Sequence, residues 1–154
     1  HALNELRPHL PDTLTDLSYH GVDIAEPMLS QGKSLTEHIH VKKSWTTYWP
    51  DSVNARPTLF LFSYLFANLT TDEGEALAEN VVLHVEKTGA PAVGLIQNSS
   101  RDDRNLTTAA FLGRLRQLGQ YQLLEEGVRS IEYRSNPRAT PRAEDVLFHR
   151  FLVS

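Results

Sequence analysis

The hydrophobic positions of this chain change their spacing repeatedly, from that of a strand to that of a helix and back. The clearest strand pattern is TLFLFSYLF, residues 58–66, a short continuous apolar run that is typical of a strand covered on both faces. Apolar residues at helical spacing follow within residues 73–89. Thr71 or Asp72 is the expected N-cap of this helix, and Gly89 is expected to end it.

The same alternation continues on both sides of this strand and helix. A short helix is predicted within residues 1–16, and Pro27 suits the first turn of a second one. Only a loop rich in proline and arginine separates the last two predicted strands, so these strands should pair antiparallel. The pattern as a whole predicts a mixed-sheet α/β domain. Its remaining elements are strands at 17–24, 38–45, 91–99, 121–136 and 144–154 and helices at 26–38 and 105–121.

Length and composition narrow the class of protein. With 154 residues, 40 % hydrophobic and 22 % charged, the chain has the size and composition of a single domain over residues 1–154. Its longest apolar run is far too short to cross a membrane. The absence of cysteine excludes disulfides and thiolate metal sites and fits a reducing, cytoplasmic location. The net charge of −4 and the scattered basic residues disfavour a nucleic-acid partner.

The segment YHGVDIAEPML, residues 19–29, places a carboxylate between a strand and a helix. Together with the order of elements and the terminal antiparallel hairpin, it resembles the class I methyltransferases that use S-adenosyl-L-methionine. The resemblance implies a Rossmann-like mixed sheet, mostly parallel, with helices on both faces. It also implies that Asp23, at the end of a strand, accepts hydrogen bonds from the ribose hydroxyls of this cofactor.

The same resemblance assigns further residues to the site. FSYLFANL, residues 62–69, corresponds to a strand end beside the methyl donor, and the aromatic loop 45–49 lies near the adenine. The implied cofactor-binding residues are Asp23, Ile24, Met28, Ser63 and Tyr64, and the implied substrate-binding residues are Asn68, Trp45 and Trp49. No residue is assigned a catalytic role, because transfer of an already activated methyl group mainly requires alignment of the reactants.

The chain departs from the family at its start. The glycine-rich loop that follows the family's first strand does not precede Asp23, and the first residue is His1 rather than Met. The family's first strand is central in the sheet, and its loss would leave two strand edges unpaired. We therefore expect residues 1–154 to be the C-terminal portion of a longer chain, or to associate with a partner chain that supplies this strand.

Several of these residues also have a purely structural interpretation. Asp23 is able to cap the following helix, Asn68 to lie in a turn and cap the helix after it, and Trp45 and Trp49 to pack in the core. The H-x-H pair His38 and His40 shares one strand face but has no third ligand at a persuasive spacing, so no metal site is expected. His84 and His149 lie in apolar segments and are interpreted as structural. The basic stretch with Arg134, Arg138 and Arg142 is interpreted as a solvated loop or as a contact for an anionic substrate.

Three functions are compatible with the sequence. The first is an S-adenosyl-L-methionine-dependent methyltransferase, or its C-terminal portion, that acts on a small-molecule or protein acceptor. The second is a methyltransferase-like module that binds without catalysis, which the missing glycine loop favours. The third, a nicotinamide-dependent oxidoreductase, is disfavoured by the antiparallel hairpin and by the absence of G-x-G-x-x-G.

Overall fold

The structure, a computed structural model, describes residues 19–22, 27, 30, 39–42, 56–101, 105–133 and 140–154. These residues belong to two compact units, His1–Asp51 and Ser52–Ser154, and each unit is described by itself. The prediction that residues 1–154 form one domain stays a prediction.

The first unit contains two short parallel strands. Strand β1, Tyr19–Val22, pairs with strand β2, Ile39–Lys42, and Tyr19 lies opposite Ile39. Between them, Pro27 and Ser30 have helical backbone conformation. A parallel pair requires a crossover connection of a dozen or more residues, and a helix is the usual one. Pro27 and Ser30 fall within the predicted helix 26–38, and the other residues of that prediction lie outside the described residues.

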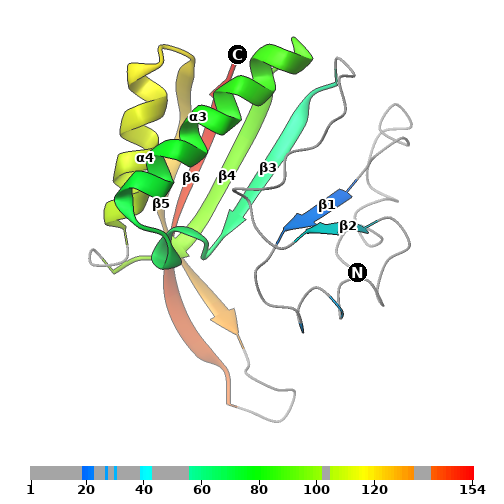
Figure 1. Ribbon diagram of the computed structural model, residues 1–154. Coiled ribbons are helices and arrows are strands. Elements are labelled where there is room, and N and C mark those ends of the chain that lie inside the picture. Colours follow the sequence, from blue (N-terminus) through cyan, green and yellow to red (C-terminus); the bar gives the residue numbers. More distant parts are fainter. Residues whose placement is uncertain are drawn as a thin grey trace. The chain divides into compact units, whose positions relative to one another are not determined.

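The second unit is a four-stranded sheet in the order β3-β4-β6-β5 (Figure 1). Strands β3 and β4 are parallel, whereas β6 is antiparallel to both β4 and β5. This arrangement confirms the predicted mixed α/β sheet that ends in an antiparallel hairpin. One of the three strand pairs of this sheet is parallel, so the mostly parallel character of the whole sheet stays a prediction. The strands are β3, Thr58–Ser63; β4, Ala92–Ser99; β5, Tyr121–Tyr133; and β6, Arg142–Val153.

Helix α3, Thr71–Thr88, begins and ends at well-defined caps. The Thr70 hydroxyl accepts a hydrogen bond from the Glu73 N–H at 3.3 Å, and the Glu73 carboxylate accepts one from the Thr70 N–H at 2.8 Å. This reciprocal pair satisfies two N–H groups that a helix start leaves open. Gly89 ends the helix with a φ of 62°, as predicted. The predicted N-cap, Thr71 or Asp72, was wrong by one or two residues, because the Thr70 side chain accepts the Glu73 N–H and the helix starts at Thr71.

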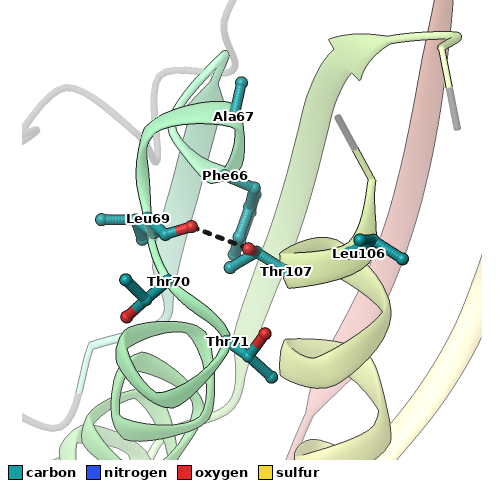
Figure 2. Close-up of a pocket in the computed structure, with 7 residues that line it drawn as sticks. All are labelled: Phe66, Ala67, Leu69, Thr70, Thr71, Leu106 and Thr107. Carbon is teal, nitrogen blue, oxygen red and sulfur yellow. Dashed lines mark hydrogen bonds between the residues drawn. The ribbon is translucent and has the colours of Figure 1, made fainter. Parts of the chain in front are cut away.

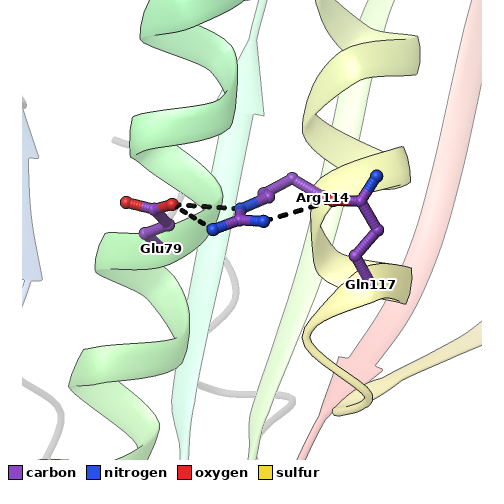
Figure 3. A network of polar contacts seen from close by, with 3 residues as sticks. All are labelled: Glu79, Arg114 and Gln117. Atoms are coloured by element: carbon purple, nitrogen blue, oxygen red, sulfur yellow. Dashed lines mark hydrogen bonds and ion pairs between the residues drawn. The ribbon is translucent and has the colours of Figure 1, made fainter.

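Helix α4, Leu106–Gln117, lies beside α3, and both helices cover the same face of the sheet (Figure 1). A Cβ built on Gly74 of α3 would lie 2.7 Å from the Thr107 methyl group, so a side chain is excluded where the helices approach. Farther along, the Arg114 guanidinium donates two hydrogen bonds to Glu79 and one to Gln117 (Figure 3). Helices on the opposite face of the sheet stay a prediction.

The core lies between this sheet face and the two helices. Four phenylalanine rings form its centre, with centroids between 5.0 and 5.8 Å apart along the chain of contacts from Phe62 through Phe66 and Phe111 to Phe151. Edge contacts between aromatic rings add to the stabilisation gained by burying their apolar surface. Phe66, Phe111 and Phe151 are fully buried, and the cluster joins α4 and η3 to strands β3 and β6.

Two histidines are buried in this core, as their apolar sequence surroundings predict. His84 Nε2 lies 2.9 Å from the Thr58 hydroxyl and joins α3 to β3. His149 Nε2 lies 3.5 Å from a Glu126 carboxylate oxygen, while its Nδ1 is buried without a hydrogen-bond partner among the described residues. Burial lowers the pKa of both imidazoles below the ordinary value of 6.5, with Lys87 adding to the effect at His84 and Glu126 opposing it at His149.

These lowered pKa values predict that stability falls as the solution is acidified. Above pH 6.5 both histidines are neutral in the folded and the unfolded chain, so their contribution to stability is fully present. Below that pH the unfolded chain takes up protons that the folded chain resists, and the free energy of unfolding decreases. Urea unfolding of the protein and of a His84→Gln, His149→Gln variant at pH 7.5 and 5.5 tests this. The variant should lose less stability between the two pH values, and an equal loss would contradict the prediction.

Candidate functional site

The strand predicted at 58–66 stops earlier than expected and gives way to a tight turn. Strand β3 ends at Ser63, and residues Phe66–Asn68 form a short 3₁₀ helix, η3. The residue directly after the strand, Tyr64, has a φ of 53°, the only positive value for a residue other than glycine in the described part of the chain. The prediction of a strand through residue 66 was wrong because continuous hydrophobicity does not distinguish a strand from a buried turn.

Two hydrogen bonds hold Tyr64 in this conformation. Its N–H donates to the Gln97 carbonyl of β4 at 2.8 Å, and its carbonyl accepts from the Asn68 side chain at 3.2 Å. Asn68 therefore closes the turn, and its structural interpretation as the cap of the following helix was wrong, because Thr70 is the N-cap of α3. Its role in substrate binding stays a prediction. A left-handed backbone at a large residue is uncommon and is concentrated at functional sites, so the carboxyl end of β3 is the leading candidate within this unit.

The backbone at Tyr64 leads to a prediction about stability. Tyr64→Gly and Tyr64→Ala both remove the phenol ring, but only glycine adopts a positive φ without a steric cost. The glycine variant should therefore be the more stable of the two by about 1 kcal/mol. Urea unfolding measures the difference. At Ser63, inside the strand, the alanine variant should be the more stable instead, and the same order at both positions would contradict the assignment of strain to Tyr64.

A hollow of about 340 Å³ lies beside this turn, where α3 and α4 begin (Figure 2). The Thr107 hydroxyl donates to the Leu69 carbonyl at 2.8 Å and so ties α4 to the segment after η3. None of the lining side chains is titratable, so the hollow offers shape and hydroxyl groups but no acid or base. It is lined by Phe66, Ala67, Leu69, Thr70, Thr71, Leu106 and Thr107.

The carboxyl end of β4 is fixed by asparagines whose role the sequence did not reveal. Asn98 is fully buried, and its amide donates to the Asn105 side chain at 3.0 Å. The Asn105 amide donates in turn to the carbonyls of Ser99 and Arg101, both at 2.8 Å. These bonds bring the start of α4 to the end of β4 and shape the segment QNSS. In the sequence both residues are parts of N-x-S/T triplets, and the burial of Asn98 leaves no room for a glycan there.

The structure brings only part of the predicted site together. Ser63 is exposed at the end of β3, with Tyr64 and Asn68 in the turn that follows. The other predicted residues lie outside the described residues, although Val22, the last residue of β1, directly precedes Asp23. In the part of the chain that the structure describes, no three histidine or acidic side chains cluster closely enough to hold a metal ion. The predicted residues outside it are Asp23, Ile24, Met28, Trp45 and Trp49.

Comparison with known proteins shows a likeness of fold. No family model and no curated protein matches the chain. A solved structure of a candidate methyltransferase from Thermoplasma acidophilum is similar, with a TM-score of 0.53 and 10 % sequence identity. The match covers 89 % of this chain and 57 % of that one, so the chain spans little more than half the length of its structural neighbour. This likeness shows that the chain has a methyltransferase-like fold.

Over the described ranges no helix combines the length and the hydrophobicity needed to span a bilayer.

Proposed function

We propose that the chain is the S-adenosyl-L-methionine-binding part of a class I methyltransferase that acts on a small-molecule or protein acceptor. The observation that carries the proposal is the sheet order β3-β4-β6-β5, in which a parallel pair is followed by a reversed hairpin. The fold likeness to the candidate methyltransferase from Thermoplasma acidophilum supports it. The acidic Asp23 directly after β1 supports a ribose-binding role in particular.

The residues present fit such a cofactor in chemical type. Ligands of open α/β sheets bind at the carboxyl ends of the strands, and Asp23, Ser63 and Tyr64 all follow or end a strand. When bound, S-adenosyl-L-methionine supplies a methyl group already activated on a sulfonium. We assign Asp23 to the ribose hydroxyls, Ile24 and Met28 to the apolar wall beside them, and Ser63 with Tyr64 to the methyl-donor end.

The acceptor side is assigned to Asn68, Trp45 and Trp49. An amide both donates and accepts hydrogen bonds, and indole rings supply flat apolar surface, so this set suits an acceptor with polar and planar parts. The chain's own contribution to the reaction would be to align the acceptor with the methyl group and to exclude water from it.

Calorimetric titration with S-adenosylhomocysteine tests the proposal. The chain should bind at micromolar concentration, and Asp23→Ala should weaken binding at least about tenfold, because each hydrogen bond to a charged group contributes about 1.5–3 kcal/mol. Asp145→Ala, an exposed acidic residue of β6, is the control and should leave binding unchanged. Equal affinity of the Asp23→Ala variant and the unmodified chain would refute the ribose assignment.

The alternative is a module with this fold that binds without catalysis. It is favoured by the absence of a glycine-rich loop ahead of Asp23 within the 154 residues. The same titration with a longer form of the protein separates the two. Binding to the longer form alone would make residues 1–154 an incomplete half-site, and binding to neither form would favour the non-catalytic module.

A further inference from the structure

Strand β5 lies at one edge of the four-stranded sheet, and within the described residues it pairs with β6 alone. The Ser100 N–H donates to the Asp145 carbonyl at 3.2 Å, so Asp145 directs its backbone groups toward the side of β4. Backbone direction alternates along a strand, so the even-numbered residues of β6 direct theirs toward β5, where they meet the odd-numbered residues of 125–133. Glu126 and Val128 therefore direct their N–H and C=O groups away from the sheet, along a free edge.

Two opposite charges lie symmetrically about Gly127 on this strand. Glu125 precedes Gly127 by two residues and Arg129 follows it by two, so both side chains share one face of the sheet. These side chains are 38 % and 69 % exposed. When a second copy of β5 pairs antiparallel with the first about a two-fold axis at Gly127, Glu125 of each copy lies opposite Arg129 of the other. The edge therefore carries charges that complement its own copy.

The neighbouring registers of such a pair lack this complementarity. Because outward-directed residues must face each other, the two-fold axis passes through a residue of β5. An axis at Glu126 would place two glutamates directly opposite, an axis at Arg129 would place two arginines opposite, and an axis at Val128 would place Glu125 opposite an isoleucine. Like charges destabilise a strand pair and unlike charges stabilise it. Of the axes at residues 126–129, the one at Gly127 alone brings unlike charges together.

The hairpin of β5 and β6 also extends past the rest of the sheet. β4 pairs with β6 only as far as Val146, so residues 142–145 of β6 pair with β5 alone (Figure 1). A two-stranded ribbon by itself is marginally stable in water. The two-fold axis at Gly127 lays the extension of each copy beside the first residues of β5 in the other copy. A second copy thus supplies the third strand that this extension lacks.

We propose that two copies of this chain associate through the free edge of β5, antiparallel about a two-fold axis at Gly127, into one continuous sheet. Backbone hydrogen bonds then join Glu126 of each copy to Val128 of the other. Within one chain the Arg129 guanidinium lies 3.2 Å from the Glu125 carboxylate, and in the dimer it pairs with that carboxylate of the second copy instead. Charged residues normally keep a free edge from pairing with other strands, and here they disfavour strands whose charges do not match. The dimer is independent of the proposed methyl transfer, because it uses no residue of the proposed cofactor site.

Light scattering of the chain at increasing concentration tests the proposal, and the unmodified chain should convert from monomer to dimer. Glu125→Arg and Arg129→Glu each place like charges opposite at both pairs, so each variant should weaken the dimer about tenfold or more. Mixed in equal amounts, the two variants should form a dimer with one copy of each, because unlike charges then lie opposite at both pairs. Glu132→Arg is the matched control. Glu132 is an exposed acid of the same strand that lies opposite no charged residue in the dimer, so its reversal should change the affinity by no more than about twofold.

Three outcomes of this experiment would overturn the proposal. The first is an unmodified chain that stays monomeric at all concentrations. The second is a mixture of the two charge variants that associates no better than either variant alone. The third is a single charge variant that dimerises as tightly as the unmodified chain, which would place the interface elsewhere.

Amide hydrogen exchange gives a second readout that needs no substitution. In the dimer the amides of Glu126 and Val128 should exchange roughly tenfold more slowly than in the dilute monomer, because they donate across the new strand pair. The amides of Gly127 and Arg129 face β6 and should be protected at both concentrations. Equal exchange of Glu126 and Val128 in a dimeric and a monomeric sample would exclude strand pairing at this edge.

Discussion

Phe111→Ala should lower the free energy of unfolding by about 3–5 kcal/mol, the usual cost of removing a buried aromatic ring. Phe111 is fully buried, and its ring centroid lies 5.6 Å from that of Phe62, 5.0 Å from that of Phe66 and 5.8 Å from that of Phe151. Removal of the Phe111 ring leaves a cavity bordered by rings from three elements, β3, η3 and β6. A small shift of α4 cannot fill this cavity, because α4 would have to approach all three elements at once. Urea unfolding followed by circular dichroism measures the loss.

Leu106→Ala is the control for Phe111→Ala. Leu106 begins the same helix but is 72 % exposed, so its truncation should change stability by no more than about 0.5 kcal/mol. A loss of less than about 1 kcal/mol for Phe111→Ala would mean that the four rings do not form the core described here.

Gly94→Ala is expected to be nearly as damaging, although it adds a single methyl group. Gly94 lies opposite Phe151 in the pairing of β4 with β6, and a Cβ built on it would lie 2.1 to 2.5 Å from three atoms of the Phe151 ring. The ring is fully buried and has no free space to enter, so either β4 moves or the phenylalanine leaves its rotamer. We expect a loss of about 3 kcal/mol, at the upper end of the usual cost of overpacking a core. Thermal or urea unfolding checks the value.

Gly113→Ala serves as the control for Gly94→Ala. Gly113 lies within α4, and a Cβ built there meets nothing within 4 Å, so alanine should stabilise the protein by about 0.5–1 kcal/mol. The double variant Gly94→Ala, Phe151→Leu should recover part of the loss, because the smaller side chain makes room for the new methyl group. Additive losses in the double variant would show that Phe151 is not the obstacle.

Much of the second unit was predictable from its sequence, because its elements carry strong local signals. The helical spacing of residues 73–89 and the glycine after them locate α3 to within two residues at each end. The sequence NPRATPRA, residues 136–143, lacks a helical pattern and predicts the antiparallel pairing that β5 and β6 show. Boundaries inside apolar runs were not predictable, and the strand predicted over 58–66 ends at Ser63 because Tyr64 turns the chain. A tertiary hydrogen bond to Gln97 and a local one from the Asn68 side chain fix that turn, and the apolar pattern encodes neither of them.

The candidate site was predictable to a smaller extent. The family resemblance placed Ser63 and Tyr64 at a strand end, whereas the apolar run alone extended the strand to Phe66. The functions of Asn98 and Asn105 could not be predicted, since they depend on contacts between the end of β4 and the start of α4. The ligand-binding roles of all the predicted residues stay predictions that binding measurements must test.

The position of β6 has a consequence for synthesis on the ribosome. β6 is the last strand of these residues, yet it lies between β4 and β5 and is the sole partner of β5 in the described sheet. Chains are made from the N-terminus at about 5–20 residues per second, so β3, β4 and β5 emerge before the strand that joins them. The nascent sheet therefore cannot close until residues 142–153 have left the exit tunnel. Until then β4 and β5 are exposed edges, and a ribosome that stalls in the last twelve codons of this region would leave a chain prone to aggregation and to capture by chaperones.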